Sequence, residues 1–514
     1  MSSSGADPAA VPPAASAAKR RRRALYAILG ALAVIVALTT KPLIHVVSTA
    51  WRDVNELEPV PAGFADDVSR LNRTPVAEVV PVEPDVEVAE RQLAALLERA
   101  SHEGLKVSIA GARHSMGGHT IYTGGLVINM LPFRHMEFDA RREILHVGAG
   151  ARWRDIIPYL DGFQRSVGVM QSDNTFSVGG SLSVNCHGWQ FGRPPIASSV
   201  ESFRLMRADG SIVRCSRDEN QELFSLALGG YGLFGIILDA ELRVVPNERY
   251  RLEQFIVPVG DAIATYEKKV RQQPDAVMVY ARMGIVPSEF LEEVILNVLY
   301  RDRAPDGEIP ELSEPGLVGI RRSLFRGSVG SDYGKELRWA AEARLQPHLS
   351  QRHFSRNQLL NEGSEIYQNR SAQTTDVLHE YFIPMLNIER FVVDLRAIIP
   401  RHRCDLLNVT VRGIETDVDS FLRYADQPVI SFVMLFNQPR DEEGDTRMQA
   451  LTRELIDAAL HHGGRYYLPY RLHATPAQFR RAYPQADEFF ALKLRYDPDE
   501  LFQSQFYLKY KDPP

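Results

Sequence analysis

The stretch Gly-Ala-Arg-His-Ser-Met-Gly-Gly at residues 111–118 gives the strongest indication of the fold. It follows residues 106–110, which are predicted to form a β-strand. A turn of such small residues lets successive backbone N–H groups converge on an anion such as a pyrophosphate. His114 and Ser115 stand where their side chains could reach the same ligand. An ordinary tight turn with a surface histidine would explain the same pattern, so both interpretations stay open here.

A second glycine-rich stretch, Ser-Val-Gly-Gly-Ser-Leu-Ser-Val-Asn-Cys-His-Gly, occupies residues 177–188. Paired glycines followed by small polar residues let a flat ligand approach the main chain closely. The alternative is a bulged strand at a sheet edge. Cys186 is expected to be a small buried apolar group, because no base stands beside it in the sequence.

A third stretch, Gly-Tyr-Gly-Leu-Phe-Gly at residues 230–235, satisfies the dinucleotide-binding pattern of three glycines. That pattern requires a strand before it and a helix after it. Here a helix is predicted over residues 220–228 and a strand over residues 234–245, so the order is reversed. We therefore reject a Rossmann site and keep only the prediction that something approaches this backbone.

In this order and spacing, the three stretches resemble the FAD-binding domain of the vanillyl-alcohol oxidase and p-cresol methylhydroxylase flavoproteins. The resemblance implies an α+β protein. It would have a two-subdomain FAD-binding domain at residues 76–247 and an α+β cap, or substrate, domain at residues 248–465. A C-terminal segment, residues 466–514, would return to the FAD domain.

The same resemblance implies which residues bind FAD. Gly111 to Ser115 would contact the pyrophosphate. Ser172, Ser177 and Gly180 to His187 would line the pyrophosphate and the isoalloxazine, and Ile237 would meet the adenine end through its backbone. The full set is Gly111, Ala112, Arg113, His114, Ser115, Ser172, Ser177, Val178, Gly179, Gly180, Val184, Asn185, Cys186, His187 and Ile237.

The Arg-His-Ser turn is similar to that of alditol and aldonolactone oxidases, where the histidine bonds covalently to the flavin. His114 is therefore the candidate attachment site. Bicovalent relatives carry a cysteine ahead of the paired glycines, whereas Phe176 and its neighbours offer none. At most one covalent link is expected, and some relatives with this fold bind FAD without any.

The C-terminal half resembles the cap domain of decaprenylphosphoryl ribose oxidase and its relatives more loosely. Tyr470 stands where those enzymes have a lysine, and Glu380 matches a substrate-facing glutamine. The His-Trp-x-Lys signature of aldonolactone oxidases is absent near the C-terminus. Glu380 and Tyr470 are the candidate bases, with Arg471 or Arg412 holding an anionic or polyhydroxy substrate. Each could instead be structural: a salt-bridged carboxylate, a packed ring or a surface charge.

The implied reaction is hydride transfer from a CH–OH group to flavin N5, with a base taking the hydroxyl proton. The donor would be a sugar, polyol, lactone or lipid-linked sugar, and the acceptor a quinone or oxygen. Two alternatives are a catalytically silent flavin-binding membrane protein acting as partner or sensor, and a binding module without flavin.

The N-terminus differs from the rest of the chain. Residues 1–23 are rich in Ala, Ser and Pro and end in Lys19 and four arginines, which indicates a disordered basic tail. Residues 24–44 contain an uncharged apolar run and are predicted to be a single transmembrane anchor, with a cleaved signal as the alternative. The basic residues would place the N-terminus in the cytoplasm and the catalytic domain on the outer, periplasmic side. Residues 45–75 are predicted to be a linker.

The composition of the 514-residue chain sets further bounds. A net charge of −6 gives no electrostatic case for nucleic acid as a partner. The three cysteines, Cys186, Cys215 and Cys404, lack metal-binding spacing, so neither a disulfide framework nor a metal site is expected.

Overall fold

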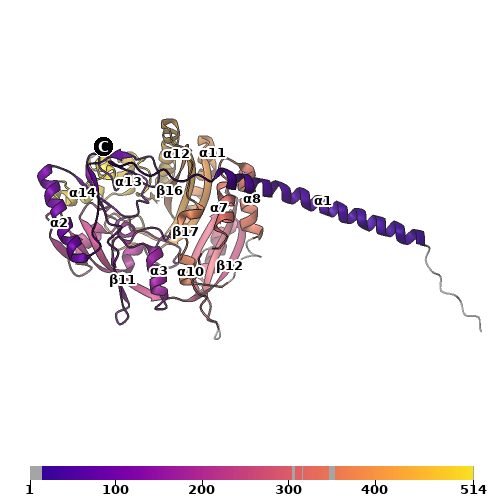
Figure 1. Ribbon diagram of the computed structural model, residues 1–514, viewed down its shortest axis with the longest axis horizontal. Coiled ribbons are helices and arrows are strands. Elements are labelled where there is room, and N and C mark those ends of the chain that lie inside the picture. The colour runs from indigo at the N-terminus through magenta and orange to yellow at the C-terminus, as the bar shows by residue number, and fades with distance from the viewer. Residues whose placement is uncertain (1–13, 304–306, 315, 346–352, 513–514) are drawn as a thin grey trace, which may run out of the picture.

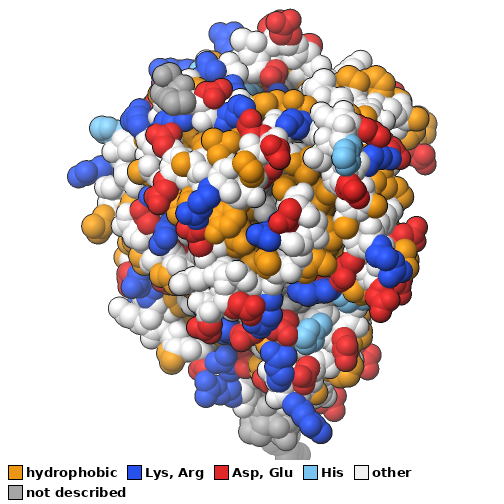
Figure 2. Space-filling view, turned by 90° about the vertical axis from the view of Figure 1, so that its left-hand side faces the viewer, with side chains coloured by type: hydrophobic (Ala, Val, Ile, Leu, Met, Phe, Trp, Pro, Cys, Tyr) orange, Lys and Arg blue, Asp and Glu red, His pale blue; other side chains and the backbone are white. Residues whose placement is uncertain are grey.

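The computed structural model describes residues 14–303, 307–314, 316–345 and 353–512. Its main body consists of two α+β domains, and helix α1 (Ala14–Arg52) projects away from them (Figure 1). On the end of the molecule opposite α1, apolar side chains gather in the middle of the face (Figure 2).

The first domain begins with a three-stranded parallel sheet in the order β3 (Glu78–Pro81), β5 (Leu126–Asn129), β4 (Val107–Ala110). Helix α2 (Val86–Glu103) makes the crossover from β3 to β4, as parallel pairing requires. Its N-cap Asp85 accepts a hydrogen bond from the Val88 N–H, and Gly104 ends it in a left-handed conformation with φ of 68°. Residues 111–118 therefore lie at the end of this sheet, directly after β4.

The second part of this domain is an antiparallel sheet that carries the other glycine-rich stretches. Its order is β10 (Ile212–Ser216), β9 (Val200–Met206), β11 (Ile236–Pro246), β7 (Ile144–Gly148), β6 (Met136–Asp139), and β8 (Arg165–Val167) also pairs with β11. Helices α3 (Trp153–Asp161), α4 (Val178–Ser183) and α5 (Gln221–Ala227) connect these strands. The paired glycines thus lie in a short helix, α4, and not in the bulged strand considered as an alternative.

The cap domain is built on an eight-stranded antiparallel sheet. Its order is β15 (His353–Ser355), β12 (Arg249–Pro258), β14 (Glu293–Arg301), β13 (Ala276–Met283), β17 (Asp405–Ile414), β18 (Val429–Pro439), β16 (Thr374–Pro384), β19 (Arg465–Tyr466). Helices α11 (Ile388–His402) and α12 (Glu442–His461) pack on one face: His379 contacts Thr452 of α12, and Tyr381 contacts Phe391 of α11. Because side chains alternate along a strand, Leu378 and Glu380 point to the opposite face.

Shorter helices complete the cap. They are α6 (Val259–Tyr266), α7 (Val318–Arg326), α8 (Asp332–Ala340) and α10 (Arg356–Leu360).

The C-terminal segment returns to the first domain. Helices α13 (Pro476–Ala482), α14 (Ala486–Tyr496) and α15 (Gln505–Tyr510) follow the last cap strand. The Val107 N–H of β4 donates to the Leu501 carbonyl at 2.8 Å, and the Gln503 N–H donates to the Val107 carbonyl at 2.9 Å. Behind this junction, Lys493 and Asp497 form a fully buried ion pair. The C-terminal segment thus pairs with β4 and extends the edge of the parallel sheet.

The N-terminal region departs from the sequence-based expectation. Residues 14–23, predicted to be disordered, and residues 45–52, predicted to be linker, belong to α1; residues 1–13 lie outside the described part. Alanines favour the helix, and its end is held on the cap by a 2.9 Å contact between His45 Nε2 and the Gly327 carbonyl. In the part of the chain that the structure describes, no helix is long and apolar enough to cross a membrane. The transmembrane anchor predicted at residues 24–44 is therefore not supported.

After α1, residues 53–75 run over the main body and form the short pair β1 (Phe64–Ala65) and β2 (Thr74–Pro75). Asp67 is buried here and accepts a hydrogen bond from the Gly118 N–H at 2.9 Å. Part of the predicted linker is thus anchored on the glycine-rich turn.

Candidate active site

A continuous cavity of about 1200 Å³ lies between the first domain and the open face of the cap sheet. All three glycine-rich stretches reach it, and so do alternate residues of β12, β13, β14, β16, β17 and β18. The fold therefore assembles one site from segments spread over most of the sequence.

The turn after β4 forms one wall of the cavity, in direct contact with the start of α4. The Ala112 N–H donates to Ser177 Oγ at 3.3 Å. A Cβ at Gly111 would lie 2.1 Å from the same oxygen, so the contact requires glycine at this position. Arg113 has a φ of 58°, a left-handed conformation that is uncommon outside glycine. Two of the predicted ligand-binding stretches thus form a single cradle.

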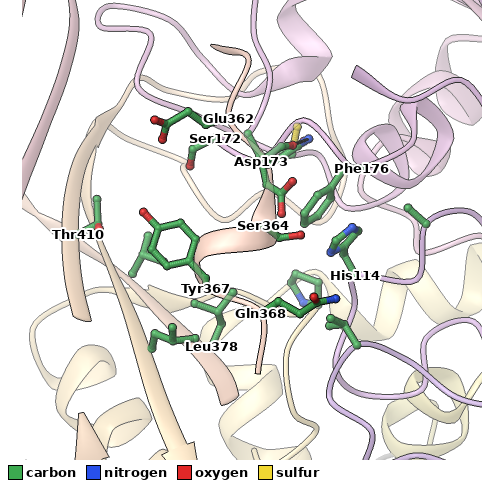
Figure 3. Close-up of a pocket in the computed structure, with 18 of the residues that line it drawn as sticks. His114, Ser172, Asp173, Phe176, Glu362, Ser364, Tyr367, Gln368, Leu378 and Thr410 are labelled. Carbon is green, nitrogen blue, oxygen red and sulfur yellow. Dashed lines mark hydrogen bonds between the residues drawn. The ribbon is translucent and has the colours of Figure 1, made fainter. Parts of the chain in front are cut away.

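His114 lies inside this cradle. Its ring stacks on Phe176, with centroids 3.9 Å apart and planes 8° from parallel. Its Nε2 lies 3.0 Å from Thr175 Oγ1, which in turn donates to Asp173 Oδ1 at 2.6 Å. Figure 3 shows the imidazole beside Phe176 and Asp173 in the cavity. Burial lowers the pKa of His114, although Asp173 opposes the shift. The imidazole is therefore neutral at pH 7.

The third glycine stretch forms the far end of the site. It lies between α5 and β11, the helix-then-strand order that excluded a Rossmann site. Gly232 has a φ of 73° and Gly235 a φ of 144°, and both line the cavity together with Ile237. Backbone and apolar surface are thus exposed to a ligand at this end.

At the cap side of the cavity, Glu380 is the centre of a buried polar network. Its Oε1 lies 2.6 Å from His187 Nε2 and accepts a hydrogen bond from Ser431 at 2.5 Å, while its Oε2 accepts one from the Tyr470 hydroxyl at 3.1 Å. Burial alone would raise the pKa of Glu380, but His187, Arg412 and Ser431 together hold it below its usual value. Glu380 is therefore an ionised carboxylate whose side chain is almost completely buried.

Arg412 lines the cavity next to this network. Its Nη2 donates to Ser172 Oγ at 2.6 Å, and its Nε is buried without a hydrogen-bond partner among the described residues. Burial lowers the pKa of Arg412, an effect that Glu380 opposes. Burial and Glu380 both raise the pKa of Tyr470, so its phenol stays protonated. The reacting region thus combines one carboxylate, one guanidinium and one phenol.

Most of the residues predicted from the sequence line the cavity. They are Gly111, Ala112, Arg113, His114, Ser115, Ser172, Ser177, Gly179, Gly180, Val184, Cys186, His187, Ile237, Glu380, Arg412 and Tyr470.

Three predicted residues do not line it. Arg471 instead forms a bidentate pair with Asp445, at 2.9 and 3.0 Å, and Asn185 donates to Asp417 at 2.8 Å. Val178 is fully buried in the core on the inner side of α4. In this fold their side chains make contacts outside the cavity lining.

Other residues of the site were missed by sequence reasoning. Asp173, Phe176 and Tyr367 line the cavity (Figure 3), as do Tyr280, Arg282, Asn408 and Thr410 on the cap sheet. On β17, Asn408, Thr410 and Arg412 are spaced two residues apart, so strand alternation from Arg412 could have identified the other two. Tyr367 lies in an irregular segment, where no periodicity indicates its direction.

The site fits a large, flat, polar-ended cofactor. Five side-chain atoms of cavity-lining residues are buried without hydrogen-bond partners among the described residues: Ser115 Oγ, His119 Nδ1, Thr120 Oγ1, His187 Nδ1 and Arg412 Nε. Buried polar groups are normally satisfied, so these atoms indicate that a ligand completes them. The glycine cradle would accept a diphosphate in the same place.

Comparison with known proteins agrees with this geometry. Residues 88–216 match the family described as an FAD binding domain. An uncharacterized oxidoreductase of the fasciation locus of Rhodococcoides fascians is 31% identical over 35% of this chain and 40% of its own length. The chain contains an FAD-binding domain of the vanillyl-alcohol oxidase and p-cresol methylhydroxylase type. This confirms the predicted resemblance and FAD as the cofactor.

Two lactone-related proteins are similar over longer stretches. L-galactono-1,4-lactone dehydrogenase of Arabidopsis thaliana is 22% identical over 46% of this chain and 38% of its own length. D-arabinono-1,4-lactone oxidase of Yarrowia lipolytica is 28% identical over 50% of this chain and 46% of its own length. The matches thus span less than half of each relative's length. Within the FAD domain, His114 and the paired glycines are the residues that would hold the cofactor.

Proposed function

We propose that this protein is an FAD-linked oxidoreductase that oxidises a CH–OH group of a small-molecule donor. Bound FAD would supply the hydride acceptor, and the cavity would hold the donor between the FAD domain and the cap sheet. The relatives named for lactone oxidation and dehydrogenation support a lactone, sugar or polyol donor. Electrons would then pass to a quinone or to oxygen.

The observation that carries this proposal is the buried pair formed by Glu380 and His187. Because Glu380 is ionised, it can only accept a hydrogen bond, so Nε2 of His187 carries the hydrogen in their 2.6 Å contact. In a neutral imidazole with the hydrogen on Nε2, Nδ1 carries a lone pair, and Nδ1 of His187 is buried without a partner among the described residues. A substrate hydroxyl could donate to it, and Glu380 would stabilise the imidazolium that forms.

Arg412 and Tyr470 would orient the donor. Arg412 has no carboxylate within ion-pair distance among the described residues, so its charge is available to an oxyanion or carboxylate of the substrate. The Tyr470 hydroxyl donates to Glu380 and helps to fix the carboxylate. The enclosed setting strengthens these electrostatic interactions because little water screens them.

The test uses the purified full-length protein. Its visible spectrum should show bound flavin, and anaerobic mixing with L-galactono-1,4-lactone, D-arabinono-1,4-lactone and a panel of sugars and polyols should bleach that spectrum with at least one donor. A flavin-loaded protein that no CH–OH compound reduces would contradict the proposed activity. Colourless protein that takes up no FAD would contradict the cofactor assignment as well.

A further inference from the structure

An apolar stripe on α7 leads from the surface into the cavity. Leu317 immediately precedes the helix, and Ile320 and Leu324 are four residues apart, so they share one side of it; all three line the cavity. Leu317 is 73% exposed and Ile320 is 54% exposed, whereas Leu324 is half-buried. The stripe is therefore open to solvent at its N-terminal end and enclosed at its C-terminal end.

The segment after α1 supplies a second apolar wall. We call residues 53–63 the N-terminal strap. Its Leu57 and Val60 also line the cavity and are 39% and 40% exposed. Asp53 accepts a hydrogen bond from Arg322 Nη2 at 2.8 Å, which fastens the strap to α7. Isolated exposed apolar residues are ordinary, but here four of them border one cavity.

Strand β16 gives the distance from the C-terminal end of α7 to the reacting groups. Arg326, at the end of α7, forms an ion pair with Asp376 at 2.5 Å. Asp376, Leu378 and Glu380 all line the cavity from the same side of β16. At about 3.3 Å per residue, Asp376 and Glu380 are roughly 13 Å apart along the strand. Leu378 makes the surface between them apolar.

The three arginines of α7 each form an ion pair with a carboxylate. Arg321 pairs with Glu362 at 2.8 Å, and Arg322 and Arg326 pair with Asp53 and Asp376. The entrance thus offers apolar surface and no unpaired charge from these arginines. Glu58 of the strap also lines the cavity beside Leu57, and Arg412 and Glu380 supply charge at the inner end.

We infer that the donor is amphipathic, with its CH–OH group at Glu380 and His187 and an apolar chain or ring system extending over Leu378 to the stripe on α7. This inference rests on the proposed function and narrows its substrate class. It requires a donor with an apolar part roughly 13 Å long. A compact sugar or lactone would leave the α7 stripe and the strap without contact.

The experiment titrates the FAD-loaded full-length protein with 1-butanol, 1-hexanol, 1-octanol and 1-decanol and follows the absorption spectrum of the bound flavin. Each probe has one CH–OH group and a tail of defined length. The Kd should fall about fourfold for each added methylene. Ile320→Asn should weaken 1-decanol binding at least tenfold and leave 1-butanol binding within twofold. Val393→Asn is the matched control, because Val393 is 61% exposed on α11 and does not line the cavity.

Three results would overturn the inference. One is a Kd that does not change with chain length, and another is an equal effect of Ile320→Asn and Val393→Asn. The third is unchanged alkanol binding in Ile320→Asn together with slower reoxidation of the reduced flavin by ubiquinone-1, which would assign the entrance to the electron acceptor. The proposed function fails separately, if the protein binds FAD and alkanols but no CH–OH donor reduces it.

Discussion

His187 of the FAD domain and Glu380 of cap strand β16 meet through a 2.6 Å contact between Nε2 and Oε1, and both side chains are almost completely buried. Each residue is fixed by its own domain: His187 follows α4, and Glu380 is bonded to Ser431 on the neighbouring strand β18. The pair therefore forms only when the cap is seated on the FAD domain.

Glu380→Gln should separate chemistry from cofactor binding. The amide keeps the size of the side chain but removes the charge that would stabilise a protonated His187. We expect anaerobic flavin reduction to slow by about 10²- to 10⁴-fold, with FAD content unchanged. Rapid-mixing absorbance measures both quantities. Glu443→Gln, which changes an 84% exposed side chain, is the control; unchanged single-turnover reduction in Glu380→Gln would remove the carboxylate from the mechanism.

Gly111→Ala should abolish or strongly weaken FAD binding. The added methyl group would lie 2.1 Å from Ser177 Oγ, so the turn and the start of α4 would have to separate. Adding Ser177→Gly removes the side chain that clashes, and the double variant should recover part of the binding. FAD content after gel filtration measures the effect. Equal FAD content in wild type and Gly111→Ala would show that this contact does not shape the site.

The individual strands, turns and helices were predictable, because each depends on residues that are close together in the sequence. The position of residues 111–118 after a strand and the helix-then-strand order around residues 230–235 were correct. Residues 177–188 gave a weaker signal, since two glycines disfavour helix, yet they start the short helix α4 against the FAD cradle.

Long-range pairing explains what the sequence did not reveal. Arg471 neighbours Tyr470 in sequence, but it points away to Asp445 and Asn72, and nothing local shows that partner. Glu380 and His187 were both selected, though not as a pair, because their contact depends on how two domains dock. The N-terminal strap was predicted as a linker because the sequence there is polar and contains prolines; its Leu57 and Val60 line the cavity through tertiary packing, which the sequence does not show.

His114→Ala tests covalent attachment of the flavin. Nε2 of His114 is hydrogen-bonded to Thr175 Oγ1. A bond to the flavin would therefore form through Nδ1 of the neutral imidazole. After acid precipitation, yellow colour should stay with the wild-type pellet and move to the supernatant in His114→Ala. Thr175→Val, which removes only the hydrogen bond, should keep the pellet yellow. Colour in the wild-type supernatant would show that FAD is held without a covalent bond.

Asp445→Asn should make stability less dependent on pH. Burial alone would raise the pKa of Asp445, but the hydrogen bond from His473 and the charge of Arg471 lower it overall. A carboxylate whose pKa is lower in the folded state stabilises the fold above its unfolded pKa of about 3.9 and loses that contribution as the pH falls further. About a third of the side chain is exposed (34%), so solvent screening should limit the effect to about 1 kcal/mol at pH 7.

Urea unfolding of wild type and Asp445→Asn at pH 7, 5, 4 and 3 measures this difference. Wild type should be the more stable at pH 7 and 5, and the gap should narrow between pH 4 and pH 3. Asp457→Asn is the control, because Asp457 and its partner Arg481 are both more than half exposed, so that pair should contribute almost nothing at any of these pH values. A gap that stays constant down to pH 3 would mean that Asp445 acts through packing and hydrogen bonding, and not through its charge on Arg471.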